Sequence, residues 1–462
     1  MKKGLKKTAA LAMAGVLAAG LTACGGGGTA ATTAAPETKK EETTTKAETQ
    51  AEETKKEETE AASGDQQQVS FWHSMGGKNG ELLQSIVDNY NASQDKIKVT
   101  AEYQGDYYSA IAKAQNAIAA GNGPDILQTG SGQVSILAKE EGVLENLVPY
   151  MEKSGMEFSD FNPTFITGMS LDPTKTDSLV AFPMGCSTPV LYCNMDLMEK
   201  AGASVPVTWD ELSDIAKKMI ADGTVEYGFT IPHDPWYFWM FVAQNDTKVF
   251  SEDGLKLACV DDGTGIEAIQ KVQDMCKDKV MYFGPVSDSD STCRGMFLEG
   301  KSAFYVSSIA QLGNIDSNAE FKYSVQYVPK LKVNAVPSGG NTLTMLASSK
   351  NKDAAWEFLH WLYTDNGGVA TFAAETGYLP CSQSISQMPA IKEKWASNPN
   401  CEVAYNQLEY GNNDHMVMQP NNGDIANNVS AMMEACFYDF EDVDEQMKIL
   451  KEEAEDILAD LQ

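Results

Sequence analysis

Hydrophobic positions follow two different periods from about residue 69 onward. Ile97, Val99 and Ala101 alternate with polar residues, as they do in a half-buried strand. Apolar residues between 82 and 90 instead recur at helical spacing, which is typical of a helix with one buried face. The pattern predicts helices between strands at 69–72, 97–103 and 125–129. Strands joined by helices in this way pair in parallel within one sheet.

The same succession of strands and helices continues to the C-terminus. Thr208 and Glu211 form a capping box that opens one of the predicted helices. Further strands are expected at 179–183 and 303–306, and further helices at 208–220, 266–275, 355–362 and 447–461. The region from Val69 to Gln462 is too long for one compact core, so this α/β pattern predicts two lobes.

The first 24 residues have the pattern of an export signal. Four lysines precede an Ala-rich apolar run at 8–20, which is too short to span a bilayer comfortably. The run leads into Leu21-Thr22-Ala23-Cys24, which is similar to the bacterial lipobox, in which the cysteine is lipidated and becomes the new first residue. The sequence therefore predicts a signal peptide at 1–23 and a lipid attached to Cys24. The alternative is an ordinary secretory signal followed by a chance cysteine.

Residues 24–68 are predicted to form a disordered, solvated tether. They are rich in Gly, Thr, Glu, Lys and Ala and have almost no large apolar side chains. Such a segment cannot bury enough surface to offset the entropy that ordering would cost. A flexible coil of this length has a reach on the order of 35–40 Å. A tether of this kind suits a protein that is held at a membrane surface.

The charge balance and the cysteine pattern narrow the range of partners and cofactors. The net charge of −30 disfavours nucleic acid and anionic lipid as partners. The nine cysteines include no Cys-x-x-Cys pair and the four histidines are far apart, so neither a metal nor another cofactor is expected. Lipidation of Cys24 leaves eight cysteines. Export permits disulfides, but buried free thiols are the default expectation.

Aromatic, hydroxyl and glycine residues follow the predicted strands. In open α/β sheets, ligands bind beyond the C-terminal ends of the strands. The segments that follow the strands are 72–74, 105–108, 130–132, 185–188 and 236–239. They contain no nucleophile with a matching base and acid, whereas aromatic faces and hydroxyls suit a sugar or polyol. The alternative is that the aromatic residues belong to the core, and this is the favoured interpretation for Phe238 and Trp239.

Several motifs resemble the family-1 extracellular solute-binding proteins of ABC importers, a carbohydrate-uptake family. They are FWHSMGG at 71–77, GDYYSAI at 105–111, GNGPDILQ at 121–128, STPVLYCN at 187–194, PVTWDEL at 206–212 and TGYLP at 376–380. The resemblance extends, with gaps, over nearly all of 69–462 and is strongest to the glycerol-3-phosphate-binding subgroup. It implies the type II periplasmic-binding-protein fold, with two α/β lobes, mostly parallel sheets and several hinge crossings.

The resemblance also implies where the lobes and the ligand site lie. The first lobe would take 69–186 plus 347–397, and the second lobe 187–346 plus 398–462. Strand ends and family motifs together give the candidate ligand-binding residues Trp72, His73, Tyr107, Ser131, Ser187, Trp236, Ser308, Gly339, Gly340 and Tyr378. No catalytic residue and no metal ligand are expected among them.

Two departures from the subgroup bear on the ligand. Ser131 stands where the glycerol-phosphate binders have an acidic residue, and Met418 stands where they have an arginine in the cleft. The one arginine in the sequence, Arg294, falls in a helix expected at the surface, where solvation is favoured over a ligand role. Phosphate is held best by the two parallel donors of an arginine, although helix N-termini also bind it. A neutral sugar or polyol is therefore favoured.

The predicted function is a lipid-anchored extracellular solute-binding protein. It would capture a sugar, oligosaccharide or polyol and deliver it to the transmembrane subunits of an ABC importer, as a monomer on the outer face of the cell membrane. A binding protein for glycerol-3-phosphate or a glycerophosphodiester is the alternative. A ligand-sensing lipoprotein or an enzyme acting on polysaccharide is the second alternative, and such an enzyme needs two cleft carboxylates at a defined separation.

Overall fold

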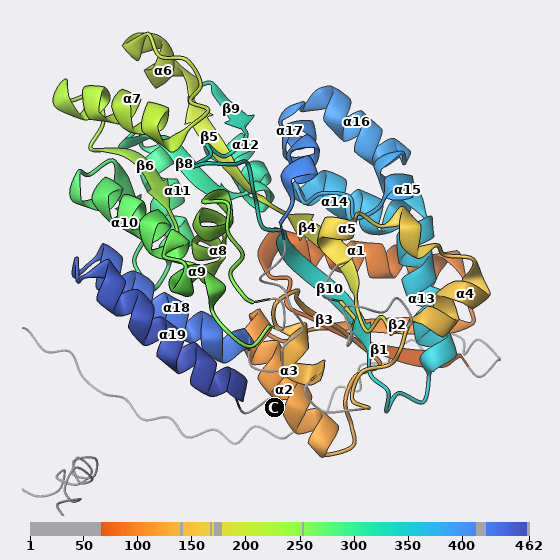
Figure 1. Ribbon diagram of the computed structural model, residues 1–462. Helices are drawn as coiled ribbons and strands as arrows, with labels where there is room; N and C mark the ends of the chain where they lie inside the picture. Colours follow the sequence, from red (N-terminus) through yellow and green to blue (C-terminus); the bar gives the residue numbers. More distant parts are fainter. Residues whose placement is uncertain are drawn as a thin grey trace, which may run out of the picture. The chain divides into compact units, whose positions relative to one another are not determined.

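The computed structural model describes residues 66–138, 142–166, 169–170, 178–251, 254–412 and 422–459 (Figure 1). They belong to one compact unit, Ser63–Gln462. The predicted signal peptide, Cys24, most of the tether and Met418 lie outside the described residues. The tether prediction runs slightly too far, because Gln67 and Gln68 already pair with the neighbouring strand. Backbone hydrogen bonds hold this strand start, so its polar side chains do not prevent it.

The first sheet has the strand order β2-β1-β3-β10-β4. Its strands are β1 (Gln67–His73), β2 (Ile97–Tyr103), β3 (Ile126–Gly130), β4 (Phe182–Ser187) and β10 (Gly339–Met345). β1 pairs in parallel with β2 and β3, and the helices between these strands are α1 (Gly77–Ser93) and α2 (Tyr107–Ala119). This arrangement confirms the predicted β-α-β-α-β unit.

The second sheet has the strand order β7-β6-β8-β5-β9. Its strands are β5 (Pro189–Asn194), β6 (Tyr227–Ile231), β7 (Met281–Phe283), β8 (Ser302–Ser308) and β9 (Tyr323–Gln326). β6 is parallel to β7 and β8, whereas β5 is antiparallel to β8 and β9. In the first sheet β10 is likewise antiparallel to both neighbours. Each sheet is therefore mixed rather than mostly parallel, because the strands next to the crossings run against their partners.

The chain crosses between the two sheets next to Ser187, where a crossing is predicted. β4 ends at Ser187 in the first sheet, and β5 begins at Pro189 in the second sheet. The chain returns between β9 and β10. Strand β10 falls inside the range predicted for the second lobe, yet it pairs with β3 and β4, so the return crossing comes before Gly339. The remaining lobe boundaries stay a prediction.

Helices cover the faces of both sheets (Figure 1). None of the helices in the described part of the chain is long and apolar enough to cross a bilayer. Besides α1 and α2, the helices are α3 (Val134–Ala138), α4 (Val148–Ser154), α5 (Pro163–Ile166), α6 (Met195–Ala201), α7 (Trp209–Ala221), α8 (Pro235–Gln244), α9 (Ala258–Asp261), α10 (Thr264–Lys277), α11 (Ser289–Leu298), α12 (Leu312–Asn318), α13 (Lys352–Thr364), α14 (Thr371–Thr376), α15 (Gln383–Ser386), α16 (Pro389–Ser397), α17 (Asn400–Gln407), α18 (Asn422–Phe437) and α19 (Val443–Ala459).

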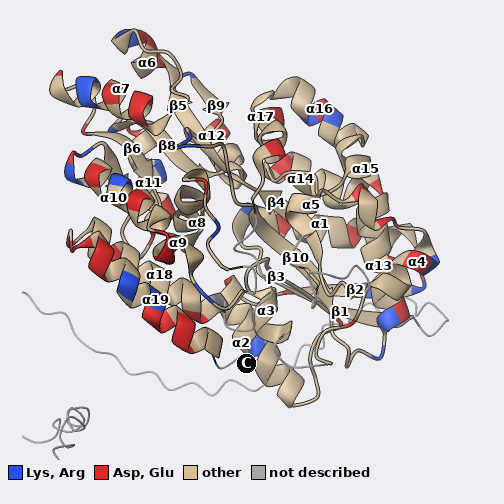
Figure 2. Ribbon diagram, in the orientation of Figure 1, with Lys and Arg blue, Asp and Glu red and all other residues tan. Residues whose placement is uncertain are grey.

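Local sequence explains how α7 begins. The Thr208 hydroxyl accepts a hydrogen bond from the backbone N–H of Glu211 at 3.2 Å, and the Glu211 carboxylate accepts one from the backbone N–H of Thr208 at 3.3 Å. This confirms the predicted capping box, which satisfies two backbone donors that the helix itself leaves unpaired. Figure 2 shows acidic residues along α7, α10 and α19. Acidic residues in the first turns of α7 and α19 also complement the positive end of each helix dipole.

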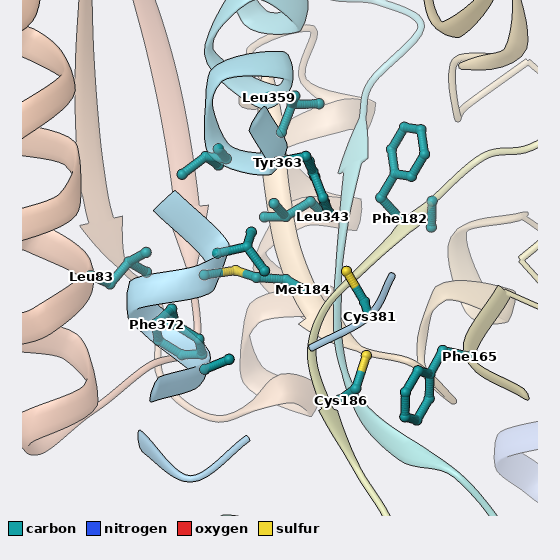
Figure 3. Packing of buried hydrophobic residues seen from close by; sticks show 14 of the residues in the cluster. Leu83, Phe165, Phe182, Met184, Cys186, Leu343, Leu359, Tyr363, Phe372 and Cys381 are labelled. Atoms are coloured by element: carbon teal, nitrogen blue, oxygen red, sulfur yellow. The ribbon is translucent and has the colours of Figure 1, made fainter. Parts of the chain in front are cut away.

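A hydrophobic core fills the space between the first sheet and its helices. Figure 3 shows Leu83 of α1, Leu343 of β10, Leu359 and Tyr363 of α13, and Phe372 of α14 packed together. All of them are buried. Complete burial of an aliphatic or aromatic side chain contributes roughly 1.5–3 kcal/mol. This core holds the strand ends that carry the site.

The eight described cysteines are free, and all but Cys276 are buried. Cys186 and Cys381 lie beside each other in this core (Figure 3). Burial raises the pKa of the Cys186 thiol well above its usual range, and the neighbouring Cys381 raises it further. The thiolate is the reactive form of cysteine, so the Cys186 thiol is chemically inert at neutral pH.

Candidate ligand-binding site

A cavity of about 510 Å³ lies between the residues that follow the strands of the two sheets. One wall, called here the first wall, consists of Tyr107, Tyr108, Ser131, Gly132, Gly339, Gly340 and Tyr378. The other, called here the second wall, consists of Pro232–Tyr237, Trp239, Ser289, Asp290, Ser307 and Ser308. Ser187 lies at the crossing between them. The strand-end rule therefore predicts the location of the cavity correctly.

Eight of the ten candidate ligand-binding residues lie on the cavity walls. They are Tyr107, Ser131, Ser187, Trp236, Ser308, Gly339, Gly340 and Tyr378. They come from segments as far apart in the sequence as α2 and the loop after α14, and the fold brings them together. Their role in ligand binding stays a prediction, because no ligand is present.

Trp72 and His73 do not line the cavity. Trp72 packs against the core of the first sheet. The His73 ring is buried between Phe71 and Tyr103, and its Nδ1 accepts a hydrogen bond from the backbone N–H of Met75 at 3.3 Å. Burial lowers the pKa of His73 and favours the neutral ring that this hydrogen bond requires. Both residues at the end of β1 pack within the first sheet and its core. Their position therefore does not support a role in ligand binding.

Two tyrosines and an asparagine form an uncharged cluster at the first wall. The hydroxyl groups of Tyr107 and Tyr378 lie beside each other and beside the Asn341 amide, and burial raises the pKa of both tyrosines. The Tyr378 ring also stacks on Phe372, with ring centroids 5.7 Å apart. Neither the oxygen nor the nitrogen of the buried Asn341 amide makes a hydrogen bond of standard geometry with any described residue. The Asn341 amide therefore interacts with the two tyrosine hydroxyls only loosely and keeps capacity for a further hydrogen bond.

Asn341 was not identified from the sequence, although a signal for it exists. It is the third residue of β10 and lines a small cavity that shares Ser131 and Gly339 with the large one. A polar amide within an otherwise buried strand needs a partner. The sequence analysis names Gly339 and Gly340 of this strand as candidate residues but not Asn341, which follows them.

The glycine pair allows the two walls to approach closely. A Cβ atom on Gly339 would lie 3.0 Å from the indole ring of Trp236, and the Trp236 Nε1–H donates to the Ser338 carbonyl at 3.0 Å. Gly340 has a φ of 120°, and a Cβ atom there would lie 1.8 Å from the carbonyl oxygen of Gly185. Only glycine satisfies both conditions at position 340. Trp236 of the second wall therefore rests directly on the backbone of the first.

Helix α8 positions the aromatic part of the second wall. Asp234 caps the helix, and its Oδ1 accepts a hydrogen bond from the backbone N–H of Trp236 at 2.8 Å. Phe238 is fully buried in the core, as predicted. Trp239 is almost fully buried as well, but it also reaches the cavity. The prediction that both rings belong to the core is therefore confirmed for Phe238. It holds only in part for Trp239, whose large ring contacts the core and the cavity.

Two carboxylates of the second wall were not identified from the sequence. Asp234 is exposed to solvent within the cavity, yet protein surrounds it on several sides. This partial desolvation raises the pKa of Asp234, the nearby charge of Asp290 raises it further, and the hydrogen bond from Trp236 opposes the shift. An Asp-Pro pair before an apolar helix is typical of a helix cap and does not indicate that the cap faces a cavity.

Asp290 is held by three donors. Its Oδ1 accepts hydrogen bonds from Tyr305 Oη at 2.6 Å and Ser307 Oγ at 2.9 Å, and its Oδ2 accepts one from Arg294 Nη1 at 2.7 Å. Arg294 also donates to Gln311 Oε1 at 2.7 Å, and its side chain is only 17% exposed. The expectation that Arg294 is a solvated surface residue is therefore wrong. Arg294 lies one turn of α11 after Asp290, so the two side chains form an ion pair. Asp290 lines the cavity, whereas Arg294 does not.

His233 joins the second wall to the C-terminal helices. A hydrogen bond of 2.6 Å connects its Nε2 to the Ser430 hydroxyl of α18, and its ring packs against Phe283 and Tyr438. Burial lowers the pKa of His233, which favours the neutral ring at physiological pH. Across the described residues, no group of three or more His, Cys, Asp or Glu side chains is positioned to hold a metal ion. The cavity therefore offers aromatic faces, hydroxyls, amides and two carboxylates.

A family model described as "Bacterial extracellular solute-binding protein" matches residues 85–400. The sn-glycerol-3-phosphate-binding periplasmic protein UgpB of Pectobacterium atrosepticum is 28% identical over 366 residues, which is 74% of this chain and 79% of that protein. UgpB of Brucella melitensis is 26% identical over 363 residues, covering 74% and 81% of the two chains. The match thus spans most of the length of both relatives, which are named as binding proteins.

Solved structures share the fold at low sequence identity. The GacH receptor of Streptomyces glaucescens, studied unliganded and with acarbose, superposes with a TM-score of 0.74 at 20% identity and covers 86% of this chain and 99% of its own. UgpB of Mycobacterium tuberculosis in complex with glycerophosphocholine gives a TM-score of 0.73 at 20% identity, with 86% and 100% covered. These likenesses confirm the two-lobed, type II periplasmic-binding-protein fold.

Proposed function

This chain belongs to the bacterial extracellular solute-binding proteins, and from that premise we propose that it captures a sugar, oligosaccharide or polyol and delivers it to the permease of an ABC importer. The ligand is held between the first wall and the second wall. The proposal rests on one observation above all: aromatic rings from both sheets, Tyr107 and Tyr378 on one side and Trp236 and Trp239 on the other, line the same cavity.

Aromatic walls with hydroxyl groups between them suit the chemistry of a carbohydrate. The C–H faces of a sugar ring are apolar and pack on aromatic rings, while its hydroxyls need donors and acceptors around the edge. Ser131, Ser187 and Ser308 provide such groups, and Asn341 adds an unpaired amide nearby. A cavity of about 510 Å³ falls in the range of small-molecule sites. A monosaccharide or a short oligosaccharide fits this space.

The proposal includes the way the protein is held at the membrane. The lipobox-like segment before Cys24 supports removal of a signal peptide and attachment of a diacylglycerol group, which would anchor the protein on the outer face of the cell membrane. The acidic tether supports free reorientation over a permease. We infer that the protein acts as a monomer, since the ligand is enclosed by two lobes of a single chain.

Glycerol-3-phosphate or a glycerophosphodiester is the second candidate ligand. It is favoured by the sequence relatives, which bind glycerol-3-phosphate according to their names. It is disfavoured by the chemistry of the cavity, because no lysine or arginine lies among the described residues that line it. A phosphate monoester carries nearly two negative charges, which arginine or lysine donors would balance most directly.

An enzymatic role is a weaker candidate. Hydrolysis of a glycosidic bond needs two carboxyl groups on opposite sides of the bond that is cleaved. The cavity contains Asp234 and Asp290, but both lie on the second wall. Asp290 is also engaged by Arg294, Tyr305 and Ser307. This arrangement favours binding without chemical change.

A thermal-shift screen of the purified protein tests the proposal. The probes are neutral mono-, di- and trisaccharides, polyols, glycerol-3-phosphate and glycerophosphocholine. We expect at least one neutral carbohydrate or polyol to raise the melting temperature and to be recovered unchanged after incubation. Chemical turnover of the stabilising probe would contradict a binding role. Stabilisation by glycerol-3-phosphate alone would replace the proposed ligand with the second candidate.

A further inference from the structure

The second wall carries charge that the proposed carbohydrate ligand does not obviously require. Asp234 and Asp290 both line the cavity, and the charge of one raises the pKa of the other. The Asp290 side chain is 36% exposed, so it faces solvent as well as its three donors. Two carboxylates on one wall create a negative potential inside the cavity.

The only arginine of the sequence lies directly behind this pair but is occupied. Its Nη1 contacts Asp290 Oδ2 and Gln311 Oε1, both at 2.7 Å, and its Nη2 contacts Ser291 Oγ at 3.1 Å. A guanidinium group that is committed to a carboxylate in this way has few donors left for a ligand. The charges of Asp234, Asp290 and Arg294 therefore leave the second wall with one net negative charge.

The rest of the cavity offers no positive charge to compensate. Among its described lining residues the ionisable groups other than tyrosine are His233, Asp234 and Asp290. Burial lowers the pKa of His233 and keeps the ring neutral. The first wall contributes uncharged groups, and the Asn341 amide, which lines the small neighbouring cavity, lies beside Tyr107 and Tyr378. An anion entering this cavity would lose its hydration shell without gaining a cationic partner.

We propose that Asp234 and Asp290 determine ligand class by excluding phosphorylated ligands and accepting hydrogen bonds from the hydroxyl groups of an uncharged polyhydroxy ligand. Asp290 has two functions in this arrangement. Its carboxylate accepts a hydrogen bond from the ligand, and it occupies the guanidinium group of Arg294, which therefore does not bind a phosphate. This inference rests on the proposed function, because it assigns the chemistry of the same cavity. It separates this chain from the glycerol-3-phosphate-binding relatives by residues on the second wall.

The test exchanges each carboxylate for its isosteric amide. Asp234→Asn keeps a good helix cap, and Asp290→Asn keeps one oxygen acceptor, so both variants are expected to fold. Asp288→Asn is the matched control, because Asp288 is exposed, lies two residues from Asp290 and does not line the cavity. Calorimetric titration with glycerol-3-phosphate and with the stabilising neutral carbohydrate from the screen is performed on wild type, each single variant and the double variant.

The two probes are expected to respond in opposite directions. Affinity for glycerol-3-phosphate should rise by about tenfold or more in Asp290→Asn and further in the double variant, and this gain should decrease with added salt. Affinity for the neutral carbohydrate should fall by about threefold to tenfold in each variant, in line with the loss of a charged acceptor. Asp288→Asn should change neither affinity.

Three results would overturn the inference while leaving the proposed function intact. One is tight glycerol-3-phosphate binding by the wild type alongside carbohydrate binding. Another is a glycerol-3-phosphate affinity that stays unchanged in both single variants and the double variant. The third is an equal loss of affinity for both probes in the variants, which indicates a structural defect rather than a change in ligand class. Failure of every neutral probe to bind the wild type would instead reject the proposed function, whatever the response to glycerol-3-phosphate.

Discussion

The two walls of the cavity differ in charge and in how they are built. The first wall is uncharged: Tyr107, Tyr378 and Asn341 form a cluster of hydroxyls and an amide, supported by the core of the first sheet. The second wall combines aromatic rings with the ionic group of Asp290 and Arg294. The first wall thus offers hydrogen bonds from uncharged groups, and the second wall determines whether the cavity favours a charged or an uncharged ligand. A ligand must satisfy both, so specificity is a property of the pair.

The backbone of the first wall depends most strongly on Gly340, where β10 passes close to β4. An added Cβ atom would lie 1.8 Å from the Gly185 carbonyl oxygen, and the φ of 120° is unfavourable for any other residue. Gly340→Ala is expected to lower the free energy of unfolding by about 3 kcal/mol or more. Urea denaturation measures this. Gly132→Ala is the control on the same wall, because a Cβ atom there meets nothing within 4 Å, and an equal loss in both variants would refute the steric explanation.

Removing one aromatic ring from each wall tests whether both walls hold the ligand. Trp236→Ala and Tyr378→Ala are each expected to weaken binding of the neutral ligand by about tenfold or more, because each loses an anchoring ring in a desolvated site. Titration calorimetry measures the affinity, and circular dichroism checks that each variant is folded. If only one of the two variants loses affinity, the ligand rests on a single wall. If neither does, the site assignment is wrong.

A smaller change tests the close approach of the two walls. Gly339→Ala places a methyl group 3.0 Å from the Trp236 ring, which must then shift by a few tenths of an ångström. Affinity for the neutral ligand is expected to fall by about threefold to tenfold, with little loss of folding stability. The tryptophan fluorescence of the protein, to which Trp236 contributes as one of seven tryptophans, should shift slightly as well. An unchanged affinity would show that the exact seat of the ring on the first wall is unimportant for binding.

The smallest expected effect concerns the stability contribution of Asp234. Its folded-state pKa is raised, so the ionised carboxylate costs stability at pH values above its unfolded-state pKa, and this cost disappears as the pH falls. Asp234→Asn should therefore stabilise the protein slightly at pH 7, by about 0.5 kcal/mol or less because the group is reached by solvent. The difference should become smaller in acid, as the pH approaches the unfolded-state pKa. Parallel thermal melts at pH 7 and pH 4 measure it, and a variant less stable than wild type at pH 7 would contradict the account.

The first wall was largely predictable from the sequence. Tyr107, Ser131 and Tyr378 follow strands or lie in recognisable motifs, and the strand-end rule brings such residues together. The same rule also included Trp72 and His73, which do not line the cavity. It says where a strand ends, and it does not say whether the side chains at that end face the cavity or the helices that cover the sheet.

The second wall was predictable only in part. Trp236 was identified, but Asp290 follows β7, which spans only Met281–Phe283 and is too short to leave a pattern. Arg294 was placed at the surface because helical spacing alone does not reveal a partner such as Gln311, which comes from a distant segment. The α/β class and the two lobes depend on many residues and were predicted correctly. The mixed pairing of β5 and β10 was not, because it depends on the direction in which the chain crosses between the sheets.

Hydrogen–deuterium exchange with the stabilising neutral carbohydrate tests the central claim most directly. The account predicts that saturating ligand slows exchange simultaneously in peptides from the first wall, around 105–111 and 376–380, and in peptides from the second wall, around 232–239 and 289–294. Protection restricted to one of these walls, or located away from both, would contradict it.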